Sequence, residues 1–224
     1  MEPILRRAKN YRTAAGKSPF RDWLTRRIDG GTRGRINTRI RRISELGNYG
    51  DCEPVGDGVY ELRFDTGPGY RVYFGIDTNE IVLLSGGCKD TQVSDIRKAK
   101  GFWGSTMPKR TTDFREDLLA DLADPREAAH YLNAALEDSE KMALVALRDV
   151  AEARQMARVA EEAGVAREAL YRMLRRSGNP TFGSFMGILS ALGLKIVFAP
   201  IIPTDDPVRA RNPVSVRKRP LVRR

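Results

Sequence analysis

The sequence predicts an α+β protein, in which two helices and an antiparallel sheet are followed by an all-α part with a helix-turn-helix and a C-terminal strand. Strand-like alternation of apolar residues ends near Trp103, and helical periodicity dominates after Asp113. Between them, residues 104–112 read GSTMPKRTT, a small and polar stretch that favours a linker. We therefore expect domains at 1–105 and 113–203, a linker at 106–112 and a basic flexible tail at 204–224.

In the first domain, Ser18 followed by Pro19 indicates the start of a helix. A second helix is predicted over residues 32–46 and ends at Gly47. Strands are predicted over residues 59–64, 70–76 and 81–84, and a closing helix over residues 91–100. The expected order is two helices and then an antiparallel meander.

Alternation along the strands assigns side chains to the two faces of the sheet, because successive residues point to opposite sides. Leu62 and Val72 belong to the apolar set, whereas Arg63, Arg71 and Tyr73 fall on the other face, which we expect to be uncovered. Lys89 follows the next strand. Cations with an aromatic ring suit a phosphodiester backbone and stacked bases. A solvated face with unrelated arginines fits the same pattern equally well.

The second domain begins with a helix over residues 113–122. Asp124, Pro125 and Glu127 then predict a capped helix start, and Ser139 starts the next helix. Residues 156–175 match a helix-turn-helix, with small Ala160 where the helices cross and Gly164 in the turn. An ordinary helical hairpin matches part of this pattern.

The second helix of that motif is rich in side chains that bind DNA. Arginine pairs with guanine edges in the major groove. The DNA-binding candidates are Arg167, Glu168, Tyr171, Arg172, Arg175 and Arg176. A further helix is predicted over residues 181–192, then an apolar strand over residues 194–199 that we expect to pair with a second copy in a homodimer.

Composition narrows the partners and the compartment. The chain of 224 residues has 39 basic and 29 acidic groups, a net charge of +10, which favours nucleic acid as a partner. No apolar run has the length of a membrane helix, and Met1–Lys9 is too charged for a secretory signal. Cys52 and Cys88 fit neither a disulfide framework nor a zinc site. We expect a cytoplasmic protein without metal or cofactor.

Longer motifs resemble a known pair of families. The strings GNYGD, VYELRF, GPGYRVYF, LLSGGCKDTQ and DIRKA occur in the order shown by RelE/ParE-superfamily toxins of the HigB type. The remainder, with its helix-turn-helix and the ending GNPTFGSFMGILSALGLKI, resembles the HigA-type antitoxin. The resemblance implies a fusion of the two, with a RelE-like N-terminal fold.

The resemblance implies a type II toxin-antitoxin protein. Its toxin domain would cleave mRNA on the ribosome and inhibit translation, and its antitoxin domain would neutralise it, within or between chains, and repress its own operator DNA. Carried across by motif, the catalytic candidates are Arg63, Arg71 and Lys89. The chemistry of RNA cleavage also needs a base, for which Tyr73 or Asp90 is the candidate. The RNA-binding candidates are Arg39, Arg42 and Lys98.

Other functions remain open. Thr91, Gln92 and Asp95 stand where many ribosome-dependent members keep a tyrosine or histidine, and the only histidine, His130, lies in the second domain with an expected structural role. A ParE-like gyrase inhibitor and a transcription regulator with an inactive toxin domain are the alternatives. For neutralisation, we expect the segment 113–138 to cover the sheet face of Arg63 and Arg71, with Glu116, Asp117, Asp121 and Glu127 supplying the charge.

Overall fold

The computed structural model describes residues 5–104 and 110–198. By its contacts the chain forms one compact unit over Met1–Leu194 and a second unit over Lys195–Arg224. We call residues 5–104 the N-terminal part and residues 110–194 the C-terminal part. Both the tail expected over residues 204–224 and most of the expected linker lie outside the described residues. The α+β class is confirmed.

The N-terminal part is built on most of one sheet. Its elements are β1 (Arg7–Arg12), α1 (Pro19–Arg27), α2 (Gly30–Leu46), β2 (Cys52–Gly56), β3 (Val59–Arg63), β4 (Tyr70–Asp77), β5 (Glu80–Cys88), a 3-10 turn at Lys89–Thr91 and α3 (Gln92–Trp103). The strand order is β2-β3-β4-β5-β1-β6, and β1 runs parallel to β5 while the other pairs are antiparallel. The predicted antiparallel meander is confirmed over β3, β4 and β5, and the sheet extends beyond it through β2 at one edge and through β1 and β6 at the other.

Three of the six strands were not predicted from the sequence, for different local reasons. β1 reads RAKNYR, with too many polar groups to give an apolar alternation. β2 contains Pro54, which is tolerated because β2 is an edge strand. The third, β6 (Arg110–Asp113), pairs with β1 and takes in residues 110–112, where a linker was expected.

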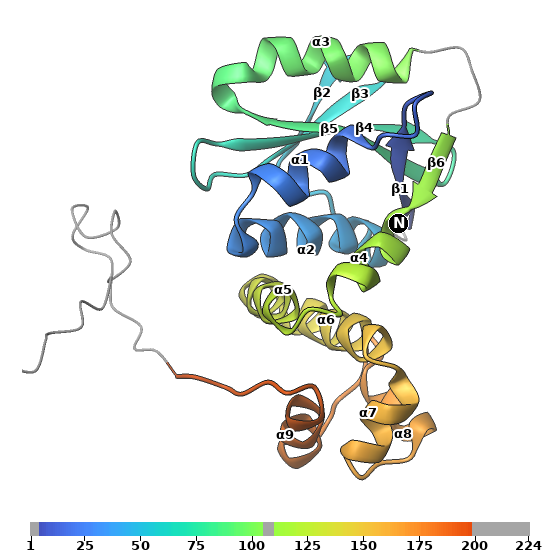
Figure 1. The fold of residues 1–224 in the computed structure, drawn as a ribbon, viewed down its shortest axis with the longest axis vertical. Coiled ribbons are helices and arrows are strands. Elements are labelled where there is room, and N and C mark those ends of the chain that lie inside the picture. Colours follow the sequence, from blue (N-terminus) through green and yellow to red (C-terminus); the bar gives the residue numbers. More distant parts are fainter. Residues whose placement is uncertain (1–4, 105–109, 199–224) are drawn as a thin grey trace, which may run out of the picture. The chain divides into compact units, whose positions relative to one another are not determined.

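Helices cover both faces of the sheet, with α1 and α2 on one side and α3 on the other (Figure 1). The α2 side holds Ile36, Ile40 and Leu62 in its core, as the alternation predicted. On the α3 side, Tyr73 and Leu84 pack against Ala99. The prediction of an uncovered face was wrong, because α3 buries that face through a small apolar core of its own.

The C-terminal part is helical after β6. It contains α4 (Phe114–Asp121), α5 (Pro125–Asp138), α6 (Glu140–Ala153), α7 (Met156–Glu162), α8 (Arg167–Met173) and α9 (Phe182–Ala191). The predicted caps are confirmed: Asp124 accepts from the backbone N–H of Arg126, and Ser139 from that of Met142.

The helix-turn-helix geometry is formed by α7 and α8. Gly164 has the left-handed backbone that the turn requires, with φ of 67°. Ala160 and Leu170 are buried between the helices, as the motif predicts. The strand predicted for residues 194–199 is not formed over residues 194–198, the part of it that is described. An isolated strand has no hydrogen-bonding neighbour within one chain.

Candidate functional site

A buried carboxylate, Glu61, organises the basic residues of the sheet. Glu61 lies opposite Tyr73 across β3 and β4, and Arg63 lies opposite Arg71. The Nε of Arg63 donates to Glu61 Oε2 at 2.9 Å, and the Tyr73 hydroxyl donates to Oε1 at 3.1 Å. Gln92 of α3 donates to the same Oε1 at 2.8 Å. Four donors or cations therefore surround one carboxylate, since Arg71 Nε also lies 3.8 Å from it.

Burial separates the roles of these residues. The side chain of Arg63 is 35% exposed and that of Arg71 is 11% exposed, so both reach the surface at the edge of α3. Tyr73 is fully buried, and desolvation together with the charge of Glu61 raises the pKa of its hydroxyl. With its proton committed to Glu61, Tyr73 supports the cluster in this structure and is poorly placed to act as a base.

Lys89 joins this group from the turn after β5. Its backbone N–H donates to the carbonyl of Gly69 at 3.0 Å. A Cβ built on Gly69 would lie 3.5 Å from Lys89 Cβ and 3.5 Å from Arg71 Nη1, which shows that the two basic residues flank the same point. Three of the predicted catalytic residues, Arg63, Arg71 and Lys89, are therefore gathered around the β3–β4 hairpin.

Two pockets lie beside this hairpin. The first, of about 600 Å³, is lined by Trp23, Arg26, Tyr70, Cys88 and Lys98 among others, and we call it the α1 pocket. The second, of about 230 Å³, is lined on one side by Arg35, Thr38, Arg39, Arg63 and Phe64 and on the other by Ala134, Glu137 and Asp138 at the end of α5. We call it the α5 pocket.

The three predicted RNA-binding residues lie in different places: Arg39 lines the α5 pocket, Lys98 lines the α1 pocket, and Arg42 contacts the C-terminal part. The guanidinium of Arg39 lies 5.4 Å above the ring centre of Phe64 and donates to the carbonyl of Tyr49. Arg42 instead pairs with Asp138 at 2.8 Å. Lys98 pairs with Asp95 at 3.3 Å and remains largely exposed at the α1 pocket.

All six predicted DNA-binding side chains are exposed on or just after α8. The guanidinium of Arg167 lies 5.6 Å from the ring centre of Tyr171, which orders both groups on the helix surface. Arg176 donates to the backbone carbonyl of Glu45 near the end of α2. Arg176 thus contacts the N-terminal part. Within residues 5–104 and 110–198, the side chains of Arg172 and Arg175 have no hydrogen-bond or ion-pair partner.

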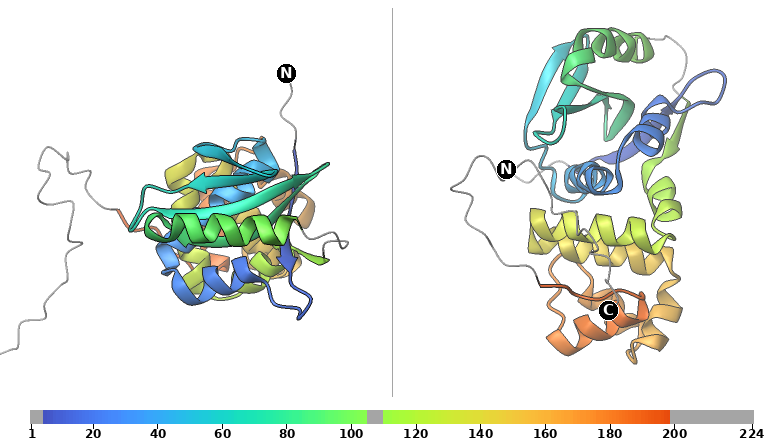
Figure 2. Two further views of the ribbon diagram at one scale, coloured as in Figure 1. Left: turned by 90° about the horizontal axis from the view of Figure 1, so that it is seen from above. Right: turned by 60° about the vertical axis from the view of Figure 1, so that its left-hand side comes forward.

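Opposite charges meet where the two parts pack together, with α5 against α2 (Figures 1 and 2). Five ion pairs join arginines of α1 and α2 to carboxylates of α4 and α5: Arg21–Asp117 at 3.8 Å, Arg21–Asp121 at 2.9 Å, Arg33–Glu127 at 3.3 Å, Arg35–Glu137 at 3.2 Å and Arg42–Asp138 at 2.8 Å. Segment 113–138 thus covers α1 and α2. The expectation that it covers the sheet face was wrong, because α3 occupies that face.

Close packing of α2 on α5 depends on Gly34. A Cβ at this position would lie 2.5 Å from the backbone oxygen of His130 and 2.8 Å from its carbonyl carbon. The helices therefore approach to a distance that only glycine permits. The side chain of His130 is exposed on one side, but its ring lies against Gly30 of α2, where an added Cβ would clash with its Cδ2. His130 therefore contacts α2 through both its backbone and its ring.

A second buried carboxylate, Asp149 of α6, joins the two parts. Arg41 of α2 donates to both of its oxygens, at 2.9 and 3.1 Å, and Arg115 of α4 and the hydroxyl of Tyr131 each donate at 3.1 Å. The side chain of Asp149 is 0% exposed and that of Arg41 is 5% exposed. Burial and the charge of Asp149 raise the pKa of Tyr131.

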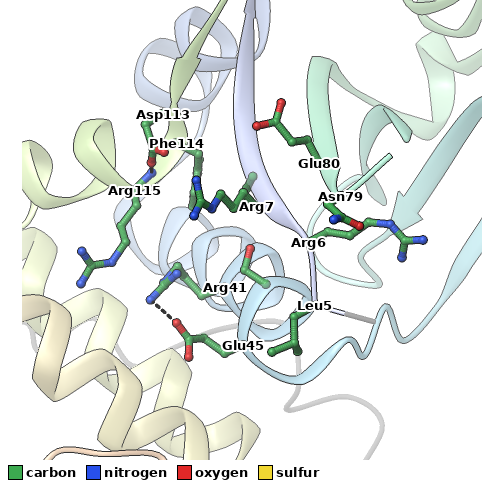
Figure 3. A pocket seen from close by; sticks show the side chains of 12 residues that line it. Leu5, Arg6, Arg7, Arg41, Glu45, Asn79, Glu80, Asp113, Phe114 and Arg115 are labelled. Carbon is green, nitrogen blue, oxygen red and sulfur yellow. Dashed lines mark hydrogen bonds and ion pairs between the residues drawn. The ribbon is translucent and has the colours of Figure 1, made fainter. Parts of the chain in front are cut away.

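Neither Glu61 nor Asp149 was identified from the sequence as a functional or structural centre. Each lies in a mostly apolar stretch, VYELRF or ALVALRDVA, next to a single arginine, and an acidic residue within such a stretch is the signal that was missed. Beside Arg41 lies a further pocket of about 600 Å³, lined by Arg6, Arg7, Glu45 and Arg115 (Figure 3). Its Arg41 pairs with Glu45 and Asp149, and its Arg115 pairs with Asp149 and Glu152.

Neither a metal-binding cluster nor a membrane-spanning helix is found in the described residues. Among residues 5–104 and 110–198 there is no group of three or more histidine, cysteine or acidic side chains arranged to hold a metal ion. No helix in these ranges is both long and apolar enough to span a bilayer. The groups that the site does present are cations, held in place by a buried carboxylate.

Comparison with known proteins gives a family for the C-terminal part. A family model described as probable addiction module antidote protein matches residues 112–200. Two uncharacterized proteins of Haemophilus influenzae (strain ATCC 51907 / DSM 11121 / KW20 / Rd) are also similar to the chain. One is 45% identical over 82 residues, which are 36% of this chain and 82% of the relative. The other is 41% identical over 90 residues, which are 40% of this chain and 91% of the relative.

No solved structure matches the chain. The family match falls on the helices that pair their carboxylates with α1 and α2, and it continues through the helix-turn-helix. Since each relative is covered over more than four fifths of its own length, the similarity extends over nearly the whole of each relative. The chain belongs, through residues 112–200, to the family of probable addiction module antidote proteins.

Proposed function

We propose that the chain is a fused toxin-antitoxin protein. Residues 1–105 act as a ribosome-dependent, metal-independent endoribonuclease on mRNA, and residues 113–203 hold this activity in check and bind operator DNA as a repressor. The antidote family of the C-terminal part supports the second role. The resemblance of the N-terminal motifs to HigB-type toxins supports the first.

The packing between the two parts is the observation that carries the proposal. Five ion pairs and the Asp149 network join α1 and α2 to α4, α5 and α6 within one compact unit. An antidote must bind its toxin, and charge complementarity of this kind gives such binding its specificity. Fusion makes the contact intramolecular, which raises the effective concentration to the order of millimolar when the linker spans the sites.

The hairpin cluster is suited to stabilising negative charge. Cleavage of RNA by its 2′-hydroxyl needs a proton acceptor, stabilisation of a pentacoordinate phosphate and a proton donor for the leaving oxygen. Glu61 holds Arg63 and the neighbouring Arg71 in place, and Lys89 lies beside them. Arginine and lysine are poor bases at neutral pH. We therefore assign them to charge stabilisation, and the need for the ribosome follows from the weakness of the acid and base groups.

Growth arrest by the N-terminal part tests the proposal. The expressed fragment should end at residue 113 rather than 105, because β6 pairs with β1 and its removal would leave β1 at an open edge. We expect this fragment to stop growth, co-expression of residues 114–224 to restore it, and the full chain to be inert. Cuts in mRNA within a translation extract identify the nuclease.

Arg71→Ala is the decisive variant. Loss of a bidentate phosphate contact in the transition state typically lowers the rate by about 10²-fold or more, so arrest should disappear. Arg97→Ala is the matched control, since Arg97 is an exposed arginine of α3 outside the cluster. Undiminished arrest by a folded Arg71→Ala fragment contradicts this site. Loss of DNA supercoiling without mRNA cuts would instead identify a gyrase inhibitor. If neither effect is observed, a transcription regulator is the remaining function.

A further inference from the structure

The α5 pocket holds three arginines suited to a phosphate group, together with four carboxylates, those of Asp51, Asp65, Glu137 and Asp138. Arg35, Arg39 and Arg63 line it, and Arg39 lies over the ring of Phe64. Burial and the neighbouring Arg42 lower the pKa of Arg39, whereas the carboxylates of Asp138, Asp51 and Asp65 raise it. Arginines of this kind favour phosphate because their fixed donors match its oxygens.

Thr38 adds an independent observation. It is only 2% exposed, it lines the same pocket, and its hydroxyl has no hydrogen-bond partner. An unpaired buried hydroxyl is costly, so a ligand that accepts or donates a hydrogen bond at this position would be favoured.

Carboxylates of the C-terminal part pair with Arg35 in the pocket and with Arg42, which neighbours Arg39 but does not line the pocket. Glu137 Oε2 lies 3.2 Å from Arg35 Nη2, and Asp138 Oδ1 lies 2.8 Å from Arg42 Nη1. Both acids are in the last turn of α5, where the helix dipole also places partial negative charge. The exposed Asp51 and Asp65 line the pocket as well, but they belong to the N-terminal part and are present whether or not α5 is bound.

We propose that the α5 pocket binds a phosphate group of single-stranded RNA, that Glu137 competes with this phosphate for Arg35, and that the charge of Asp138, which lines the pocket and pairs with Arg42, repels it. Arg63 connects the two sites, because it lines the pocket and also pairs with Glu61 beside Arg71. A strand with one phosphate in the pocket therefore continues toward the hairpin cluster. This inference rests on the proposed function and names the step by which the C-terminal part keeps substrate out.

Binding of a fluorescent hexauridylate to the full chain tests the competition. Glu137→Gln with Asp138→Asn should strengthen binding about tenfold, because two competing charges are removed. The matched control is Glu116→Gln with Glu140→Gln, two exposed acids that do not line the pocket. This control removes the same charge and should change binding less than about twofold. Inorganic phosphate at millimolar concentration should displace the RNA from the first variant.

A further substitution locates the bound RNA. Thr38→Val in the Glu137→Gln, Asp138→Asn background removes the unpaired hydroxyl with little change in shape, and it should weaken binding about threefold or more. Arg39→Gln in the same background should weaken it further. Thermal unfolding of each variant verifies that the chain is folded.

Three results would overturn the inference. In the first, the Glu137→Gln, Asp138→Asn variant binds RNA with the same affinity as the wild type. In the second, the control variant gains as much RNA affinity as the Glu137→Gln, Asp138→Asn variant. The third is that neither Thr38→Val nor Arg39→Gln weakens binding. Because binding is measured without cleavage, a failed growth-arrest or mRNA-cleavage test would count against the proposed nuclease and leave this result unaffected.

Discussion

Replacement of Gly34 by alanine should weaken the packing of the two parts of the chain. The new Cβ would lie 2.5 Å from the His130 oxygen, whereas atoms in ordinary contact are about 3.5 Å apart, so α2 and α5 must separate by about 1 Å. Overpacking of this kind costs about 1–3 kcal/mol. Against this stands the usual gain of about 0.5–1 kcal/mol when alanine replaces glycine within a helix.

Gly31→Ala isolates the strain from the change in helix propensity. Gly31 lies in the same helix, and the nearest heavy atom to its new Cβ is Asp29 Oδ1 at 3.4 Å, an ordinary contact. We expect Gly31→Ala to raise the free energy of unfolding slightly. Gly34→Ala should be less stable than Gly31→Ala by about 1–3 kcal/mol, since both gain the same helix propensity.

Urea unfolding of the full chain, followed by circular dichroism, measures the two free energies. Where the parts are expressed as separate chains, the same strain should weaken their association by about tenfold for each 1.4 kcal/mol. If Gly34→Ala proves as stable as Gly31→Ala, the close contact of α2 with the His130 carbonyl is not present in the protein.

Other substitutions test the remaining elements. Asp149→Asn should lower the free energy of unfolding by about 3 kcal/mol, because the buried Arg41 loses its ion pair with Asp149 and keeps only the one with Glu45. Glu152→Gln at the rim of the same network should cost under about 1 kcal/mol in the same urea assay. Asp29→Ala should cost about 1 kcal/mol at pH 7, because the Asp29 carboxylate accepts from the Thr32 N–H and caps α2. That hydrogen bond lowers the pKa of Asp29, so its stabilisation is present above the unfolded value of about 3.9 and is lost as the pH falls through the folded value; the difference from wild type should therefore shrink in unfolding at low pH. Arg172→Ala should relax operator specificity by about 1–3 kcal/mol in gel shifts, with Arg126→Ala as an exposed control, whereas removal of residues 204–224 should mainly reduce the salt dependence of binding.

Local features of the protein were determined by the sequence alone. The caps at Asp124 and Ser139, the end of α2 at Gly47 and the turn at Gly164 all depend on neighbours within a few residues. The faces of β3 and β4 followed from alternation for the same reason. The gathering of Arg63, Arg71 and Lys89 was predictable to that extent.

Long-range pairing was decided only by the tertiary structure. β1 pairs with β5 and β6 although its own residues are mostly polar. Its strand conformation is stabilised by backbone hydrogen bonds to strands that are distant in the sequence. Two further features depend on contacts between elements far apart in the sequence. One is the burial of Tyr73 under α3, and the other is the packing of the acidic helices α4 and α5 against α1 and α2. Glu61 and Asp149 show the physical reason most clearly, because a buried charge is stable only with partners, and Arg41 lies 108 residues from Asp149 in the chain.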